Sequence, residues 1–212
     1  MIRLSEYRPP AYLADRVVVD ISLHPTETRV RVTTSLRPNP LRQGGGTRLE
    51  LDGDELELRA ITIDGVTVSR ASYEVTAEKL SLKDPPQRPF ELTIETIVNP
   101  TANTKLMGLY RSNGVYCTQC EADGFRRISY FLDRPDVMAV YRTRIEADLA
   151  EAPLLLGNGN SVESGTIPGT GRHYAIWDDP HPKPCYLFAI VGGDLGRVHD
   201  SFTTSEGRKV SL

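Results

Sequence analysis

Residues 17–23 read Val-Val-Val-Asp-Ile-Ser-Leu, and residues 28–36 read Thr-Arg-Val-Arg-Val-Thr-Thr-Ser-Leu. Both runs are rich in β-branched residues, and the second alternates apolar with polar side chains, as a strand with one buried face requires. The intervening His-Pro-Thr-Glu at 24–27 breaks the pattern. The two runs therefore predict two strands joined by a short loop.

The same pattern recurs further along the chain. Residues 61–68 read Ile-Thr-Ile-Asp-Gly-Val-Thr-Val, and an Asp-Gly between two alternating runs is a strong signal for a two-residue hairpin turn. No helical spacing of apolar residues extends over three turns before residue 99, and the one expected helical turn lies at 135–139, where Pro135 could open it. We predict an all-β fold, an antiparallel sandwich or layered sheets. Further strand-like runs are 73–76, 80–82, 90–98, 161–166, 173–177, 195–204 and 208–212.

Two stretches near the end of the chain carry more specific predictions. Residues 185–191 form a continuous apolar run, which predicts a strand buried on both faces. Residues 178–184 contain three prolines and are expected to lie outside any sheet. Gly192-Gly193-Asp194 resembles a domain boundary, after which a last hairpin ends at Leu212 without a closing turn. We therefore expect the chain to be a piece of a longer protein.

Composition excludes several classes of function. The chain has 212 residues, 25% of them charged, and a formal net charge of −3, with no run of Lys or Arg that would favour nucleic acid or an anionic membrane. No segment approaches the roughly 20 apolar residues of a membrane span, and no signal-peptide pattern opens the sequence. A cytoplasmic protein with its three cysteines reduced is the expectation.

Residues 108–148 concentrate aromatic, charged, amide and thiol side chains, so function is expected there. Cys117 and Cys120 form a C-x-x-C motif, but a zinc site would need a second pair, and only Cys185 remains. A redox C-x-x-C would normally open a helix, which this sequence does not predict. Incidental thiols are therefore favoured over a redox or metal role. The histidines stand apart from one another in the sequence: His24, His173, His181 and His199.

Two groups of charged residues in this stretch invite opposite interpretations. Glu121 follows Gln119 in a segment of irregular sequence, where it could present acceptors to a cation or an amine, although a solvated loop carboxylate is the more ordinary reading. The sequence Asp-Arg-Pro-Asp at 133–136 favours a local ion pair that fixes a turn. From residues alone, the chain has no catalytic constellation.

Several segments, in order and at compatible spacing, resemble the N-terminal domain of the bacterial aminopeptidase N family, zinc metallo-aminopeptidases of the gluzincin type. The resemblance implies a saddle-shaped, largely antiparallel β-domain over residues 1–193 that packs on a thermolysin-like catalytic domain. Residues 194–212 would then be the first hairpin of that catalytic domain. The segments are 108–110, 117–122, 124–126, 133–137, 158–160 and 182–189.

The resemblance also implies a role for the irregular segment. Glu121 would help to hold the free α-amino group of a peptide, and Gln119 would line the pocket for its first side chain. The family's G-A-M-E-N and H-E-x-x-H-x18-E elements are absent, so the zinc would be held outside this chain, which alone should have no cofactor and no activity. Its expected partners are its own catalytic domain and peptide N-termini.

Two other classes of function stay open from the sequence. A stand-alone β-sandwich that binds sugar or protein would fit the same strands, and it predicts an exposed aromatic platform. A C-x-x-C redox protein is the third interpretation.

Residues 1–212 in isolation should bind no stoichiometric zinc and hydrolyse no aminoacyl reporter, because the sequence offers no three ligands at workable spacing. Metal analysis after dialysis, together with an activity assay, tests this. One tightly held zinc per chain would contradict the prediction.

Overall fold

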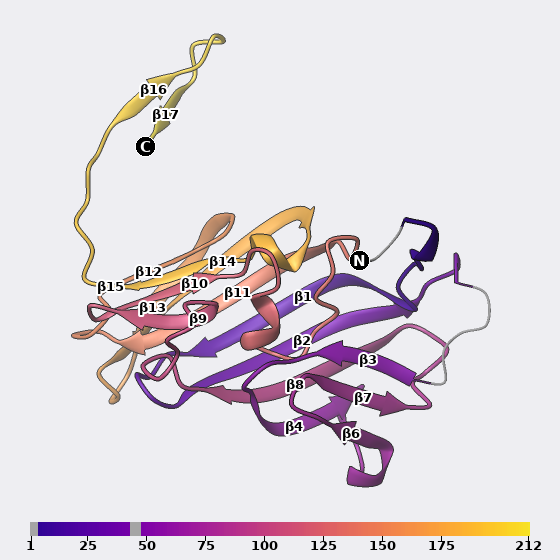
Figure 1. Cartoon of the computed structure of the whole chain (residues 1–212). Helices are drawn as coiled ribbons and strands as arrows, with labels where there is room; N and C mark the ends of the chain where they lie inside the picture. Colours follow the sequence, from indigo (N-terminus) through magenta and orange to yellow (C-terminus); the bar gives the residue numbers. More distant parts are fainter. Residues whose placement is uncertain (1–3, 43–47) are drawn as a thin grey trace.

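The computed structural model describes residues 4–42 and 48–212, and its largest element is an eight-stranded sheet in the order β13-β14-β11-β1-β2-β8-β4-β5 (Figure 1). The all-β fold class is confirmed. The strands of this sheet are β1 (Tyr12–Ser22), β2 (Thr28–Pro38), β4 (Glu57–Ile63), β5 (Val66–Thr67), β8 (Phe90–Val98), β11 (Ala139–Asp148), β13 (Asn160–Ile167) and β14 (Arg172–Lys183).

Two smaller sheets lie over one face of the large sheet, and a two-stranded hairpin stands away from both (Figure 1). The four-stranded sheet contains β9 (Gly108–Ser112), β10 (Val115–Gln119), β12 (Leu154–Gly157) and β15 (Ile190–Gly193). The three-stranded sheet contains β3 (Arg48–Asp52), β6 (Tyr73–Val75) and β7 (Lys79–Lys83). The separate hairpin is β16 (Ser201–Thr203) and β17 (Lys209–Ser211).

The hydrophobic core lies between the large sheet and its two covering sheets. Alternate residues of β1 and β2 are buried, among them Val19 and Val32, because successive side chains of a strand point to opposite faces. On the opposite face polar pairs replace apolar ones: Arg31 pairs with Glu95 at 2.6 Å. The alternation read from the sequence therefore marks which face of the sheet is covered.

One strand pairing in the large sheet is parallel. β1 runs alongside β11, with Arg16 opposite Val140 and Ser22 opposite Glu146. On its other side β1 pairs with β2 in the antiparallel sense, which confirms the hairpin predicted from residues 17–36. The sheet is thus mixed.

Both predicted tight hairpins form. Asp64 and Gly65 connect β4 to β5 with φ angles of 50° and 78°, the left-handed pair that a type I′ turn needs. β16 and β17 pair around residues 205–207, which confirms the last hairpin, but the strand predicted from residue 195 begins only at Ser201.

The expected helical turn at 135–139 is wrong. Only a turn occurs there, closed by Val137 N donating to Arg134 O at 3.3 Å, because Ala139 already belongs to β11. None of the helical segments within the described ranges is long and apolar enough to cross a membrane. The helical elements are single 3-10 turns: η1 (Leu4–Glu6), η2 (Arg70–Ser72), η3 (Phe125–Arg127) and η4 (Cys185–Leu187).

Two further sequence predictions are wrong in instructive ways. β14 continues through the proline-rich residues 180–182. Its pairing with β11 has an irregularity there, between Tyr141–Asp179 and Ala139–Lys183, and its pairing with β13 extends no further than Asp178. The prolines therefore interrupt no regular ladder of hydrogen bonds. The run 185–191 is a 3-10 turn followed by β15, with Leu187 exposed rather than buried.

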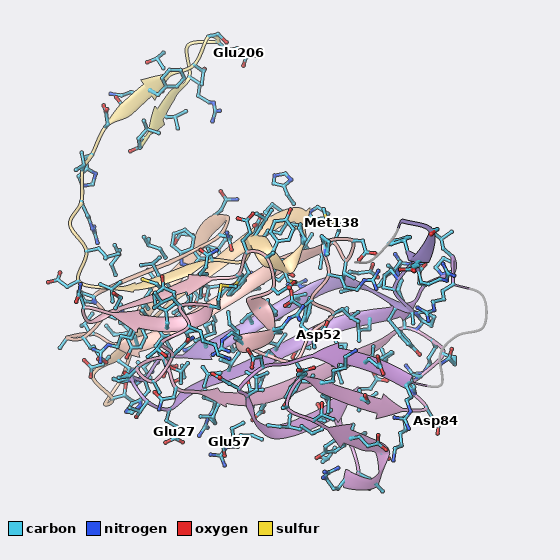
Figure 2. All side chains as sticks on the ribbon, in the orientation of Figure 1. Glu27, Asp52, Glu57, Asp84, Met138 and Glu206 are labelled. Carbon is cyan, nitrogen blue, oxygen red and sulfur yellow. The ribbon has the colours of Figure 1, made fainter. Side chains whose placement is uncertain are left out.

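The β16–β17 hairpin should be the least protected part of the folded chain in hydrogen exchange. Its strands pair with each other but with no other sheet, and its tip, at Glu206, lies far from the body (Figure 2). Exchange of residues 201–211, followed by mass spectrometry, should be complete well before that of β15. Equal protection of the two would contradict this.

Candidate functional site: the loop after β10

The segment of residues 120–124, called here the β10–η3 loop, leaves the end of β10 and folds back so that its last residue contacts its first. Gly124 N donates to Cys120 O at 2.8 Å, and a Cβ at Gly124 would lie 2.2 Å from Gln119 O. Only glycine fits such a close return of the backbone. Cys120 and Gly124 are buried, and the three residues between them form an exposed tip.

The tip brings together the two residues singled out in the sequence. Gln119 is the last residue of β10, and its Nε2 donates to Glu121 O at 3.1 Å. Both side chains are exposed, and the Glu121–Ala122 peptide is cis. Among the residues that the structure describes, no side chain forms a hydrogen bond or an ion pair with the Glu121 carboxylate. That carboxylate therefore faces solvent with its acceptors free.

The base of the loop rests on a buried carboxylate that sequence reasoning did not find. Asp133 accepts from Arg126 Nε at 2.8 Å and from Arg126 N at 3.2 Å. The sequence predicted a local pair within 133–136, and that pair also forms, between Arg134 and Asp136 at 2.6 Å. The Arg126–Asp133 pair was missed because the partners are seven positions apart, with Arg126 in η3 and Asp133 beyond it, so that no regular spacing marks the pair.

The thiols near the loop do not have the properties of a redox pair. Burial, helped by the nearby charge of Asp133, raises the pKa of Cys120 to about 12. Burial also raises the pKa of Cys185, whose Sγ donates to Asp133 Oδ1 at 3.0 Å. Reactive thiols need a lowered pKa. Burial raises the pKa of Cys117 as well, so neither thiol of the C-x-x-C has the lowered pKa that a redox role needs, and the redox interpretation loses its support.

Aromatic rings pack against Phe125 of η3, the 3-10 turn that follows the loop. The Phe125 ring lies 4.9 Å from the Phe131 ring and 5.2 Å from the Phe188 ring, both in edge-to-face geometry. Such pairs stabilise beyond simple burial, by about 0.5–1.5 kcal/mol. Since Phe131 precedes β11 and Phe188 follows η4, three separate segments meet under the loop.

The described residues do not fit a zinc ion, since no three His, Cys, Asp or Glu side chains among them are grouped to hold a metal. Tyr7 and Phe202 are exposed aromatic side chains, but they form no platform, since Tyr7 follows η1 and Phe202 lies in β16. A hollow of about 450 Å³ beside β3 has charges of both signs, including Lys79 and Asp52, but it does not include Gln119 or Glu121. The tip therefore stands outside that cavity.

The sequence of this chain is similar to a known protein family and to several curated proteins. The Peptidase M1 N-terminal domain family matches residues 16–187. Aminopeptidase N of Caulobacter vibrioides is 48% identical over 212 residues, which are all of this chain and 24% of that protein. Aminopeptidase N of Escherichia coli is 42% identical over 207 residues, which are 98% of this chain and 23% of that protein. The chain thus spans about a quarter of the length of these curated relatives.

Solved structures agree with the sequence relatives. The crystal structure of Legionella pneumophila aminopeptidase A in complex with aspartic acid has a TM-score of 0.93 and 33% identity, covering 99% of this chain and 24% of that one. The crystal structure of an M1 zinc metallopeptidase from Deinococcus radiodurans has a TM-score of 0.75 at 16% identity, covering 95% of this chain and 46% of that one, and shows likeness of fold alone. From its sequence match and its fold, the chain belongs to the family of peptidase M1 N-terminal domains.

Proposed function

We propose that this chain is the non-catalytic N-terminal domain of a zinc aminopeptidase that removes N-terminal amino acids from peptides. Its β10–η3 loop would supply Glu121 to the substrate α-amine and Gln119 to the first side chain. One observation carries the proposal: Glu121 presents an unbonded carboxylate on an exposed tip whose base is buried. The identity of 42–48% to much longer aminopeptidases N supports it. The cytoplasmic location stays a prediction.

An aminopeptidase can use such a carboxylate to recognise its substrates. The enzyme must distinguish a free α-ammonium from an internal amide, and a carboxylate does so by charge and hydrogen bonding together. An exposed ion pair contributes only about 0–1 kcal/mol, whereas an enclosed charge-assisted hydrogen bond contributes roughly 1.5–3 kcal/mol. Glu121 would therefore act only once another domain covers the tip.

The bond-breaking chemistry would come from the rest of a longer protein. Because the described residues do not fit zinc, the metal and its ligands would belong to a catalytic domain that packs on this one. Leu187 is 48% exposed in η4, and the next residue, Phe188, packs on Phe125 under the loop. A single exposed apolar side chain is common on protein surfaces, so Leu187 by itself does not locate the contact with that domain.

In the full-length enzyme, Glu121→Gln should lower kcat/KM on aminoacyl substrates by about 10- to 100-fold, because the amide keeps the shape but loses the charge that holds the ammonium. Glu27→Gln is the matched control, since Glu27 is also exposed but lies in the β1–β2 loop (Figure 2). Steady-state kinetics of both variants, with an N-acetylated substrate as blank, measure the effect. Wild-type efficiency in Glu121→Gln would exclude the amine-anchor role.

Gln119→Ala should instead reorder the preference among first side chains, because the amide would line their pocket rather than hold the amine. The variant also loses the 3.1 Å bond to Glu121 O. Relative kcat/KM on a panel of substrates with different first residues, compared with the same panel for Glu121→Gln, separates the two roles. A uniform loss across the Gln119→Ala panel would argue against a pocket role.

A further inference from the structure

Arg126 connects the exposed tip of the β10–η3 loop to the interior. Its guanidinium lies 3.3 Å from Asp123 in the tip and 2.8 Å from Asp133 below. The Asp123 side chain is 67% exposed and that of Asp133 only 1%. One side chain therefore bridges the exposed Asp123, two residues from Glu121, and the buried charge of Asp133.

Asp133 and the main chain of Arg126 are held by separate segments of the chain. The Asp133 carboxylate also accepts from Cys185 Sγ at 3.0 Å, which ties it to η4. The main chain of Arg126 is fixed too, because its carbonyl accepts from Asp54 N at 2.9 Å in the β3–β4 connection. A buried carboxylate with several donors has one preferred place, and it orients the arginine that pairs with it.

We propose that Asp133, acting through Arg126, is a positioning residue for Glu121 in substrate binding. The proposal rests on the proposed function of Glu121. Without the buried charge, the Arg126 side chain has no fixed inner partner, and its contact with Asp123 no longer ties the tip to Asp133. The Glu121 carboxylate then spends only part of its time where it can hold an amine, and the apparent affinity falls by that fraction.

The neighbouring ion pair provides a matched control. Asp136, three residues after Asp133, pairs with Arg134 at 2.6 Å and accepts from Tyr7 OH at 2.9 Å. Its side chain contacts the N-terminal segment instead of the loop. Asp136→Asn makes the same chemical change in the same stretch of chain, so it reports what loss of an ion pair alone does to the enzyme.

The test is a double-mutant cycle in the full-length enzyme. Asp133→Asn should raise KM for free-amine substrates by about ten-fold with kcat changed less than about two-fold, because a misplaced binding group weakens ground state and transition state alike. Asp136→Asn should leave both within about two-fold. In the Glu121→Gln background, Asp133→Asn should add less than about two-fold, since its effect acts through a carboxylate already removed.

The outcomes separate this inference from the function it rests on. Wild-type efficiency in Glu121→Gln would overturn both. A clear loss in Glu121→Gln, with Asp133→Asn multiplying that loss independently, would overturn only the positioning role. If Asp133→Asn does not yield folded enzyme, the same cycle with Arg126→Lys decides, since lysine keeps the charge but cannot bridge both carboxylates. Independent effects in that cycle would equally overturn the role.

Discussion

The parallel pairing of β1 with β11 is the constraint on which the rest of the structure depends. It joins β2, β8, β4 and β5, all from the first hundred residues, to β14 and β13 from the second half of the chain. Parallel neighbours cannot be joined by a tight turn and need a long crossover. Here that crossover includes β3, β6, β7, β9 and β10 of the covering sheets, so the loop after β10 is fixed between the two halves of the fold.

Local patterns found most strands but not their long-range partners. The alternation at residues 28–36 and the Asp-Gly at 64–65 depend on neighbours in sequence, so both were predictable. The β1–β11 pairing depends on residues about 120 positions apart, and no local pattern records it. The prolines of residues 180–182 misled for a related reason: whether a strand tolerates proline depends on where its neighbour strand ends.

The site was predictable only in part. Residue chemistry alone favoured a solvated Glu121, and its exposure agrees with that; the substrate role came from the family resemblance. The supporting layer was not predicted, because Asp133 was interpreted with its sequence neighbour Arg134 rather than with Arg126. Gly124 was the available signal, because glycine suits a close approach of the backbone, and a Cβ there would lie 2.2 Å from Gln119 O.

The residues that connect β15 to the last hairpin act as a tether. Residues 194–200 belong to no strand, and seven extended residues reach at most about 25 Å. Any surface that receives β16 and β17 must therefore lie within that radius of Gly193, and it meets the hairpin at an effective concentration on the order of millimolar. Weak contacts, too weak for two separate molecules, would then be enough to dock the hairpin.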